Sequence, residues 1–261
     1  MDAQGTLVDL SRPRDLGGIL GGAFRLYRAR FGVFAAIAFA VVVPVDLVIY
    51  GIAGEWLWTD PGVEGELPAG ALVASILSPW LITTPLITAG HVHAVMDLGA
   101  GRPTSAASAL GAAARRLTPV AAAIVLAGIG ATLGLVALIV PGVYLWARWF
   151  LAAQAVVAEN LGPIEALSRS ADLVRGQWWR IFGIAIVITL LTVIMGAVLV
   201  LPLQLTGNGP LMLLSQIVGD GITLSFAALA GTLLYFDARA RKQRTPAAQP
   251  PPPDLEAPER P

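Results

Sequence analysis

Three charged residues lie within apolar stretches that are long enough to cross a bilayer: Asp46, Arg148 and Asp220. Because a charge in hydrocarbon is costly, such residues usually face the interior of a bundle, pair with one another or line a polar path. All three fall in the outer half of their predicted helices. One hypothesis is a buried ion cluster in which Arg148 neutralises one or both acids. In the alternative, Arg148 extends to the outer headgroups and the acids sit near the interface.

Other reactive residue types lack the spacing that catalysis or metal binding needs. His91 and His93 are two positions apart, which places them on nearly opposite sides of a helix, whereas ligands on one helix face need a spacing of three or four. The chain has no Cys, so disulfides, thiolate zinc sites and Cys nucleophiles are excluded. No nucleophile with a base, carboxylate dyad or phosphate loop stands out. The sequence therefore predicts no enzyme, no catalytic residue, no metal and no cofactor.

The elements that position these residues are predicted to be membrane helices. Hydrophobic residues fill 56% of the 261 positions and charged residues 13%, against roughly 25% charged residues in a soluble domain. Helices need about 20 apolar residues to cross hydrocarbon, and such runs cover 31–53, 71–95, 117–140, 143–158, 181–201 and 211–236. The predicted fold class is all-α, a polytopic membrane bundle of about six transmembrane helices with amphipathic interfacial helices. Pro79 and Pro85 are expected to kink the second span.

The distribution of basic residues predicts the orientation, because loops rich in Lys and Arg stay in the cytoplasm. Arg residues lie before the first span, between the second and third spans, between the fourth and fifth spans, and after the sixth span. The loop after the first span is acidic instead. This alternation predicts a multi-pass protein of the cell membrane with both termini in the cytoplasm. The Pro-rich residues 245–261 are predicted to be a disordered cytoplasmic tail on a membrane domain of residues 1–244.

Short amphipathic segments precede the first, third and fifth spans. Apolar residues recur at helical spacing over 16–31, more weakly over 107–117, and again over 163–179. Basic residues on their other faces favour helices on the inner membrane surface that contact anionic headgroups. The predicted headgroup contacts are Arg28, Arg30, Arg116, Arg169, Arg175 and Arg180. On this interpretation the chain contains three copies of one unit, each a surface helix followed by a hairpin of two spans. The alternative interpretation is an ordinary bundle of hairpins whose inner loops happen to be basic.

Gly130 and Gly134 form a small-xxx-small pair in the third span. Such a pair lets two membrane helices approach closely. We expect these glycines to serve packing.

Three segments carry a resemblance to a known family. Residues 141–149 read Pro-Gly-Val-Tyr-Leu-Trp-Ala-Arg-Trp, residues 162–170 read Gly-Pro-Ile-Glu-Ala-Leu-Ser-Arg-Ser, and residues 173–183 read Leu-Val-Arg-Gly-Gln-Trp-Trp-Arg-Ile-Phe-Gly. Together with residues 16–28 and 234–241, they resemble the bacterial glycerophosphoryl diester phosphodiesterase membrane domain group and its uncharacterised relatives. In proteins that hydrolyse glycerophosphodiesters the chemistry belongs to a separate soluble barrel of about 250 residues, for which this chain has no room. The resemblance implies a bacterial multi-helix membrane domain without an established activity.

The function favoured by the sequence is that of a non-enzymatic integral membrane protein that assembles with, localises or regulates other components of the bacterial cell envelope. Its expected partners are a bilayer with anionic headgroups and other membrane proteins or further copies of the chain. The 17 basic and 17 acidic residues cancel, so nucleic acid is not expected. The alternative is a small transporter or permease in which Asp46, Arg148 and Asp220 line a substrate or proton path.

Overall fold

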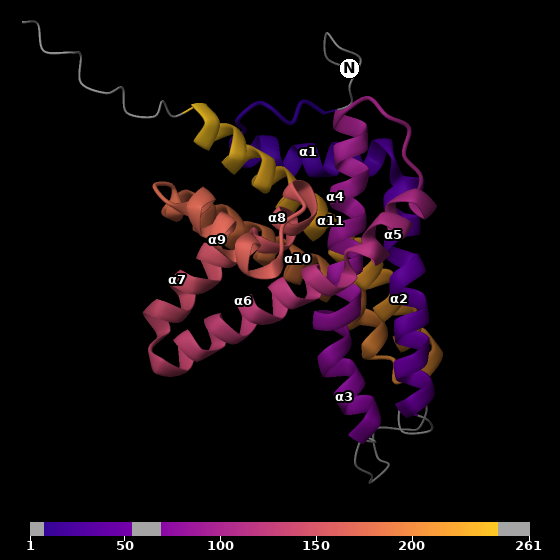
Figure 1. Cartoon of the computed structure of the whole chain (residues 1–261). Helices are drawn as coiled ribbons and strands as arrows, with labels where there is room; N and C mark the ends of the chain where they lie inside the picture. The colour runs from indigo at the N-terminus through magenta and orange to yellow at the C-terminus, as the bar shows by residue number, and fades with distance from the viewer. Residues whose placement is uncertain (1–7, 54–68, 245–261) are drawn as a thin grey trace, which may run out of the picture.

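A computed structural model describes residues 8–53 and 69–244, and every regular element in these ranges is a helix (Figure 1). In chain order the elements are α1 (Leu16–Ala29), α2 (Phe31–Ala53), α3 (Ala69–Ser78), η2 (Pro79–Thr83), α4 (Thr84–Gly99), α5 (Ala106–Arg115), α6 (Leu117–Ala137), α7 (Ile139–Trp149), α8 (Ala152–Glu159), α9 (Pro163–Val174), α10 (Trp178–Gln204) and α11 (Gly209–Arg244). A short helix, α1, α5 or α9, precedes each of the three hairpins. The predicted acidic loop and disordered tail lie outside the described residues.

Six helical segments are long and apolar enough to cross a membrane, which confirms the predicted all-α membrane bundle. They cover Phe31–Ile52, Ala69–Gly99, Leu117–Ala137, Ile139–Glu159, Trp178–Gln204 and Gly209–Arg244, and each overlaps one predicted span. Large apolar side chains on their outer surfaces are exposed, as at Leu133, Val193 and Val198. Such surfaces suit lipid and not water. The chain is a multi-pass membrane protein.

The second span changes its helical geometry where the sequence places its prolines. A π-helical turn, η2, separates α3 from α4 and begins at Pro79. Pro85 lies in the first turn of α4, where its missing N–H matters least. A π-helical turn is a recognised cause of a helix bend.

The fourth span is interrupted, whereas the sequence predicted one continuous helix over 143–158. Helix α7 ends at Trp149 and α8 begins at Ala152. The hydroxyl of the fully buried Ser170, on α9, donates to the Arg148 carbonyl oxygen at 2.8 Å and accepts from the Leu151 amide at 3.3 Å. The side chain therefore satisfies backbone groups that the break leaves without helical partners.

The third predicted surface helix is also shorter than its pattern suggested. Helix α9 ends at Val174, and the chain turns at Gly176, whose φ of 84° lies in the left-handed region that favours glycine. Trp178 and Trp179 consequently begin α10. The continuous apolar pattern over 163–179 concealed this turn.

The α6–α7 hairpin packs closely at its glycines, as the Gly130 and Gly134 pair predicted. A Cβ atom on Gly134 would lie 2.9 Å from the Cα of Gly142, and one on Gly130 would lie 2.4 Å from Cζ3 of Trp149. Real Cβ atoms essentially never approach so closely. The hairpin depends on the absence of side chains at these positions.

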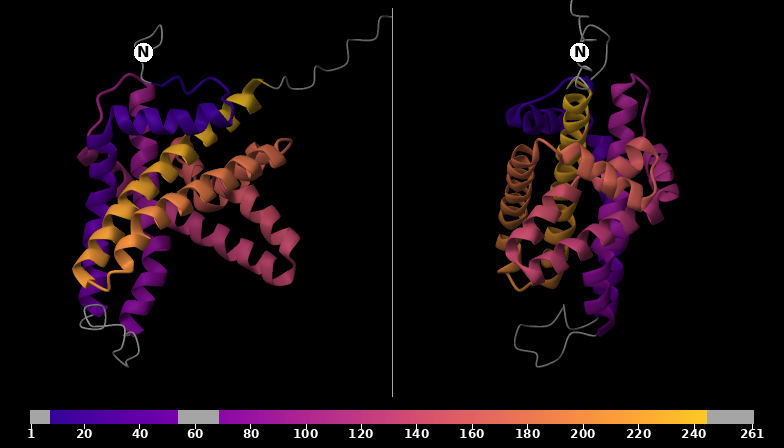
Figure 2. Two further views of the ribbon diagram at one scale, coloured as in Figure 1. Left: turned by 180° about the vertical axis from the view of Figure 1, so that it is seen from behind. Right: turned by 60° about the vertical axis from the view of Figure 1, so that its left-hand side comes forward.

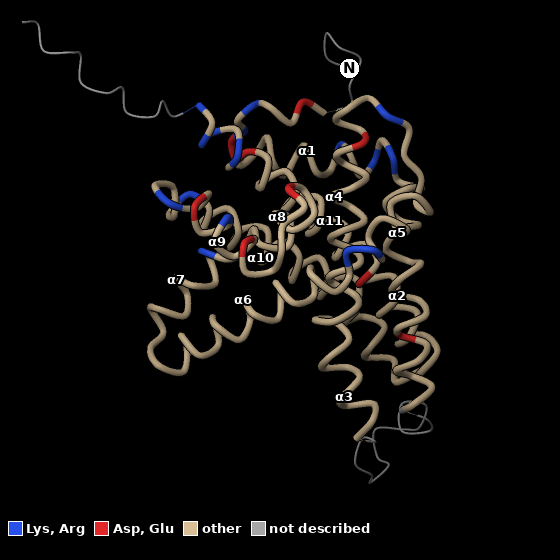
Figure 3. The backbone as a smooth tube through the Cα atoms, in the orientation of Figure 1, with Lys and Arg blue, Asp and Glu red and all other residues tan. Residues whose placement is uncertain are grey.

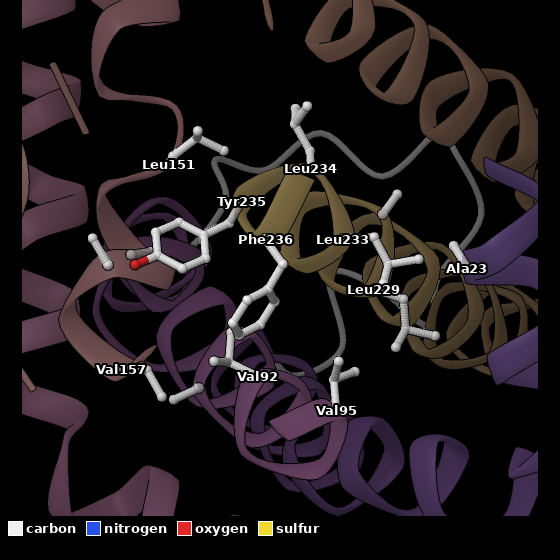
Figure 4. Close-up of a cluster of buried hydrophobic side chains, with 14 of the residues drawn as sticks. Ala23, Val92, Val95, Leu151, Val157, Leu229, Leu233, Leu234, Tyr235 and Phe236 are labelled. Atoms are coloured by element: carbon white, nitrogen blue, oxygen red, sulfur yellow. The ribbon is translucent and has the colours of Figure 1, made fainter. Parts of the chain in front are cut away.

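Helix α11 forms the centre of the bundle. It contacts α1, α2, α4 and α10 along its length, and Figure 2 shows it beside α10 with α1 lying across the end of the bundle. Figure 4 shows its buried face, where Leu229, Leu233 and Leu234 pack with Ala23, Val92 and Val95. Burial of these apolar side chains, from three different helices, holds the fold together.

Charged residues gather at one end of the molecule. Figure 3 shows Lys, Arg, Asp and Glu concentrated around α1, α9 and the last turns of α11, while the tips of α3 and of the α6–α7 hairpin are nearly free of charge. We call the part formed by α1, α9, the first turn of α10 and the C-terminal turns of α11 the charged end. The described parts of both chain ends lie there (Figure 1).

Candidate functional site

The predicted ion cluster forms only in part. Asp46 on α2 and Asp220 on α11 lie within electrostatic range of each other. Asp220 accepts a hydrogen bond from Nε2 of Gln216 at 2.9 Å, whereas the buried Oδ2 of Asp46 has no hydrogen-bond partner among the described residues. The two acids therefore influence each other's charge from two helices that pack against each other.

Arg148 does not join the acids, which corrects the predicted three-residue cluster. Its Nη1 donates to the hydroxyl of Tyr144 at 2.9 Å, and its guanidinium lies 5.8 Å from the centre of that ring. No described carboxylate lies within 4.0 Å of it. The physical reason is packing, because α7 lies on α6, α9 and α10, while Asp46 is on α2. Tyr144 also stacks on Trp178 at 5.8 Å, in the first turn of α10.

A buried carboxylate at the charged end organises a first network that the sequence analysis missed. Asp237 on α11 is fully buried and pairs with Nη1 of Arg180 at 2.6 Å and with Nε of Arg241 at 3.1 Å. It also accepts from the backbone amide of Arg14 at 2.6 Å. Both arginines donate in turn to the Arg14 carbonyl oxygen, at 2.6 and 2.9 Å. This Asp237 network fastens the segment before α1 to α10 and α11.

A second carboxylate fastens α9 to the bundle. Glu159, the last residue of α8, receives two parallel hydrogen bonds from Arg169 at 2.8 and 2.9 Å. The Tyr235 hydroxyl donates to Oε1 of Glu159 at 2.6 Å. The hydrogen bonds to Glu159 raise the pKa of Arg169 above its usual value. A planar guanidinium on a carboxylate is the strongest form of charge-assisted pairing, so this Glu159 network fixes α8, α9 and α11 together.

Further ion pairs reinforce the same contact between α9 and α11. Lys242 lies 3.3 Å from Oδ1 of Asp172 and donates to its carbonyl oxygen at 3.2 Å. Arg169 lies 3.3 Å from Oδ2 of the same Asp172. The C-terminal turns of α11 are consequently tied to α9 on one side and, through Asp237, to α10 on another.

The six predicted headgroup arginines separate into two groups. Arg169 and Arg180 belong to the two networks, so their guanidiniums bind carboxylates of the chain. The other four have no carboxylate within 4.0 Å among the described residues, and all but the half-buried Arg116 are exposed. They are Arg28, Arg30, Arg116 and Arg175. Arg25, on α1, and Arg115, at the end of α5, share that exposed state.

The apolar stripe of α1 is divided between two environments. Ile19, Ala23 and Leu26 are buried against the bundle, whereas Leu16 and Phe24 are 38% and 59% exposed. Phe31, at the start of α2, is also exposed. Exposed apolar side chains beside unpaired arginines are typical of a helix in the membrane interface.

The two histidines lie apart from any metal-binding arrangement. His91 is fully buried, stacks on Phe34 at 5.3 Å, and places Nδ1 2.8 Å from the Ile87 carbonyl oxygen. Within residues 8–53 and 69–244, no group of three or more His, Cys, Asp and Glu residues could hold a metal ion.

One comparison with known proteins bears on the chain. The family described as a domain of unknown function (DUF7847) matches residues 28–238, which include all six spans except the last turns of α11. No curated protein and no solved structure matches the chain. The comparisons therefore do not connect it to the glycerophosphoryl diester phosphodiesterase membrane domain group that its sequence resembles.

Proposed function

Because the chain belongs to the DUF7847 family, a domain of unknown function, we propose a role from its own residues: a non-enzymatic assembly or regulatory component of the bacterial cell envelope. In this proposal the charged end lies in the cytoplasm and holds anionic lipid. The bacterial origin draws support from the resemblance of residues 141–149, 162–170 and 173–183 to the bacterial membrane domain group.

The observation that carries the proposal is the uneven pairing of charge at the inner ends of the spans. Several described acids there bind arginines within the protein: Asp237 binds Arg180, Glu159 binds Arg169 and Asp97 binds Arg102. Asp15 and Glu165 accept instead from backbone amides at the starts of α1 and α9. A surplus of positive charge remains on or beside the short helices, at Arg25, Arg28, Arg30, Arg115, Arg116 and Arg175. Each basic residue near a membrane surface contributes about 1 kcal/mol to attraction for anionic lipid.

The cytoplasmic orientation follows from the same residues. Basic segments within about 15 to 20 residues of a span end are retained on the cytoplasmic side. Arg30 directly precedes α2, Arg116 directly precedes α6, and Arg175 lies three residues before α10. The three segments all support one orientation, with both described chain ends inside.

The assembly role draws support from the rigidity of the charged end. The Asp237 and Glu159 networks fix four helices and the segment before α1 through short charge-assisted bonds. A surface held in one arrangement loses little conformational freedom when a partner binds. The charged end is accordingly suited to hold another envelope component in a defined position.

The transporter alternative retains one observation, the closeness of Asp46 and Asp220. Its third member, Arg148, binds Tyr144 instead. Within residues 8–53 and 69–244, no basic side chain lies within 4.0 Å of either carboxylate to complete a substrate path. The geometry therefore favours the assembly role.

The lipid part of the proposal is tested by native mass spectrometry of the full-length protein purified from membranes that contain phosphatidylglycerol. We expect R25Q/R28Q to retain fewer phosphatidylglycerol molecules than the wild type. The matched control is R12Q/R102Q, which removes the same charge from arginines paired with Asp9 and Asp97. Equal lipid retention by both variants and the wild type would refute the proposal.

The assembly part is tested by photo-crosslinking in living cells. A photoreactive residue at Arg175, on the charged end, should give a defined protein adduct, whereas one at Val198, on the lipid-facing surface of α10, should not. The adduct should diminish in D237N, which loosens the charged end. An adduct pattern that is identical from both positions would count against a specific partner.

A further inference from the structure

Helix α7 is too short to cross a membrane by itself. It has 11 residues, which extend for about 16 Å at the rise of an α-helix. The hydrocarbon core of a bilayer is about 30 Å thick. Helix α7 therefore covers about half of that thickness.

The contacts of α7 fix one of its ends beside the charged end. The Ser170 hydroxyl, on α9, donates to the Arg148 carbonyl oxygen at 2.8 Å. Trp178, in the first turn of α10, donates from Nε1 to the Tyr144 carbonyl oxygen at 3.4 Å. Both α9 and the first turn of α10 belong to the charged end, so the last turns of α7 lie next to it.

Helix α8 does not lengthen the crossing. The Leu151 amide, directly before α8, donates to Ser170 at 3.3 Å, and Glu159, its last residue, binds Arg169 at 2.8 Å. Because both ends of α8 are joined to α9, α8 lies beside that helix and does not continue α7 across the bilayer. The segment Ile139–Glu159 is long enough for a span only when both helices are counted.

The tip of the α6–α7 hairpin is entirely apolar. Residues 135–143 read Leu-Val-Ala-Leu-Ile-Val-Pro-Gly-Val, and Ile139 and Val140 are 74% and 78% exposed. The turn between α10 and α11 differs, because residues 206–210 read Thr-Gly-Asn-Gly-Pro, a composition typical of turns in water. The exposed surface of the α6–α7 tip suits hydrocarbon instead.

The backbone of the tip also suits hydrocarbon, where free N–H and C=O groups are costly. Only Leu138 separates α6 from α7. Its N–H donates to the Gly134 carbonyl oxygen at 2.9 Å, and its own carbonyl oxygen accepts from the Gly142 amide at 3.4 Å. Pro141, in the first turn of α7, has no N–H that needs a partner. The turn consequently leaves few backbone groups free.

We propose that α6 and α7 form a re-entrant hairpin, which enters the bilayer from the side of the charged end and ends within the hydrocarbon, where its tip contacts lipid acyl chains. Helix α6 is longer than α7 but reaches the same tip, because it runs obliquely to α2 and α3 (Figure 1). A bilayer thinned to the length of α7 would bring Ile139 and Val140 into water, and the cost of such a mismatch grows with every ångström. Both ends of the hairpin stay on one side of the membrane, so the orientation of the other spans is unchanged.

The hairpin thereby gives the charged end an anchor that interacts with lipid tails, in addition to the arginines that face headgroups. This anchor does not depend on which side of the membrane the charged end occupies.

The test uses the full-length protein in phosphatidylcholine vesicles that are made permeable, so that a charged maleimide reaches both membrane surfaces. Because the chain has no Cys, single cysteines report one position each. We expect I139C to react at least tenfold more slowly than N208C, which lies in the turn between α10 and α11. V193C, at a lipid-facing position of α10, should be protected like I139C. All three should react equally after the protein is unfolded in dodecyl sulfate.

A second measurement determines the depth of the tip. A fluorophore attached to I139C should be quenched at least twofold more by lipids brominated near the ends of their acyl chains than by lipids that carry a quencher in the headgroup. The same fluorophore on N208C should show the opposite preference. Reaction of I139C as fast as N208C, or stronger quenching of its fluorophore from the headgroup, would place the tip at a membrane surface and overturn the proposal. Since the maleimide has access from both sides, neither result depends on the cytoplasmic orientation.

Discussion

Asp237 and Arg180 are 57 positions apart in the chain and are joined at the charged end by a contact of 2.6 Å between Oδ2 and Nη1. The carboxylate is fully buried, while the guanidinium is 27% exposed. Breaking a buried pair by removing one charge leaves the other uncompensated and is far costlier than breaking a surface pair. Asp237 therefore fixes the relation between α10, α11 and the segment that leads into α1.

The first prediction concerns D237N. The amide keeps the shape of the side chain but loses its charge, so the buried ion pair with Arg180 is lost. We expect a loss of about 3 kcal/mol in the free energy of unfolding. The control is D97N, whose partner Arg102 is 60% exposed and whose loss should amount to about 1 kcal/mol or less. Thermal unfolding in detergent measures both, and equal losses would contradict the central place of Asp237.

The second prediction concerns the break between α7 and α8. Replacing Ser170 by alanine removes the hydroxyl that serves the Arg148 carbonyl and the Leu151 amide. Since both partners are then unsatisfied in a buried place, S170A should destabilise the protein by about 1–3 kcal/mol. S168A, at an exposed position of the same helix, should have little effect. The backbone amide of Leu151 should also exchange its hydrogen faster in S170A than in the wild type. An unchanged exchange rate would mean that the Ser170 hydroxyl does not protect this amide.

The third prediction concerns the α6–α7 hairpin. A Cβ at position 142 would lie 2.4 Å from the backbone nitrogen of Leu135, and backbone cannot give way as a flexible side chain can. We expect G142A to cost about 1–3 kcal/mol through overpacking. G183A on α10 is the matched control, because a Cβ there meets nothing within 4 Å. It should be neutral or stabilising, since alanine favours the helix. Similar unfolding temperatures for the two variants would be inconsistent with the close packing.

The fourth prediction concerns Asp46 and Asp220. Two nearby carboxyl groups without a cation disfavour each other's charge, so D46N should raise the thermal unfolding temperature at neutral pH. The benefit of D46N should be smaller in a D220N background, because the repulsion has already been removed. A fall in unfolding temperature on D46N, of the size expected for a broken ion pair, would show that a cation does accompany the two acids.

The sequence predicted the six spans and the interruption of regular helix at Pro79 because both depend on local properties, the length of apolar runs and the geometry of proline. It failed at Arg148, since the partner of that side chain depends on how α7 packs. It also failed at the break after Trp149, because Ser170, which satisfies the broken backbone, is about twenty residues away.

The two networks of the charged end could not be predicted either, although the sequence contains a signal. The many arginines near Asp237 and Glu159 suggested contacts with headgroups, so the two acids were not considered as their partners. Asp237 stands four residues before Arg241, a spacing that favours a pair on one helix face. The long-range partners, Arg180 and the backbone of Arg14, are set by the arrangement of three separate segments.

The most direct test of the account is the side of the membrane on which the charged end lies. Because the chain has no Cys, single cysteines can be introduced at Asn208, between α10 and α11, and at Ser168, on α9. A maleimide that does not cross membranes should label N208C in intact cells and S168C only after the cells are permeabilised. Labelling of S168C, but not N208C, in intact cells would contradict the cytoplasmic orientation and the lipid-binding role built on it.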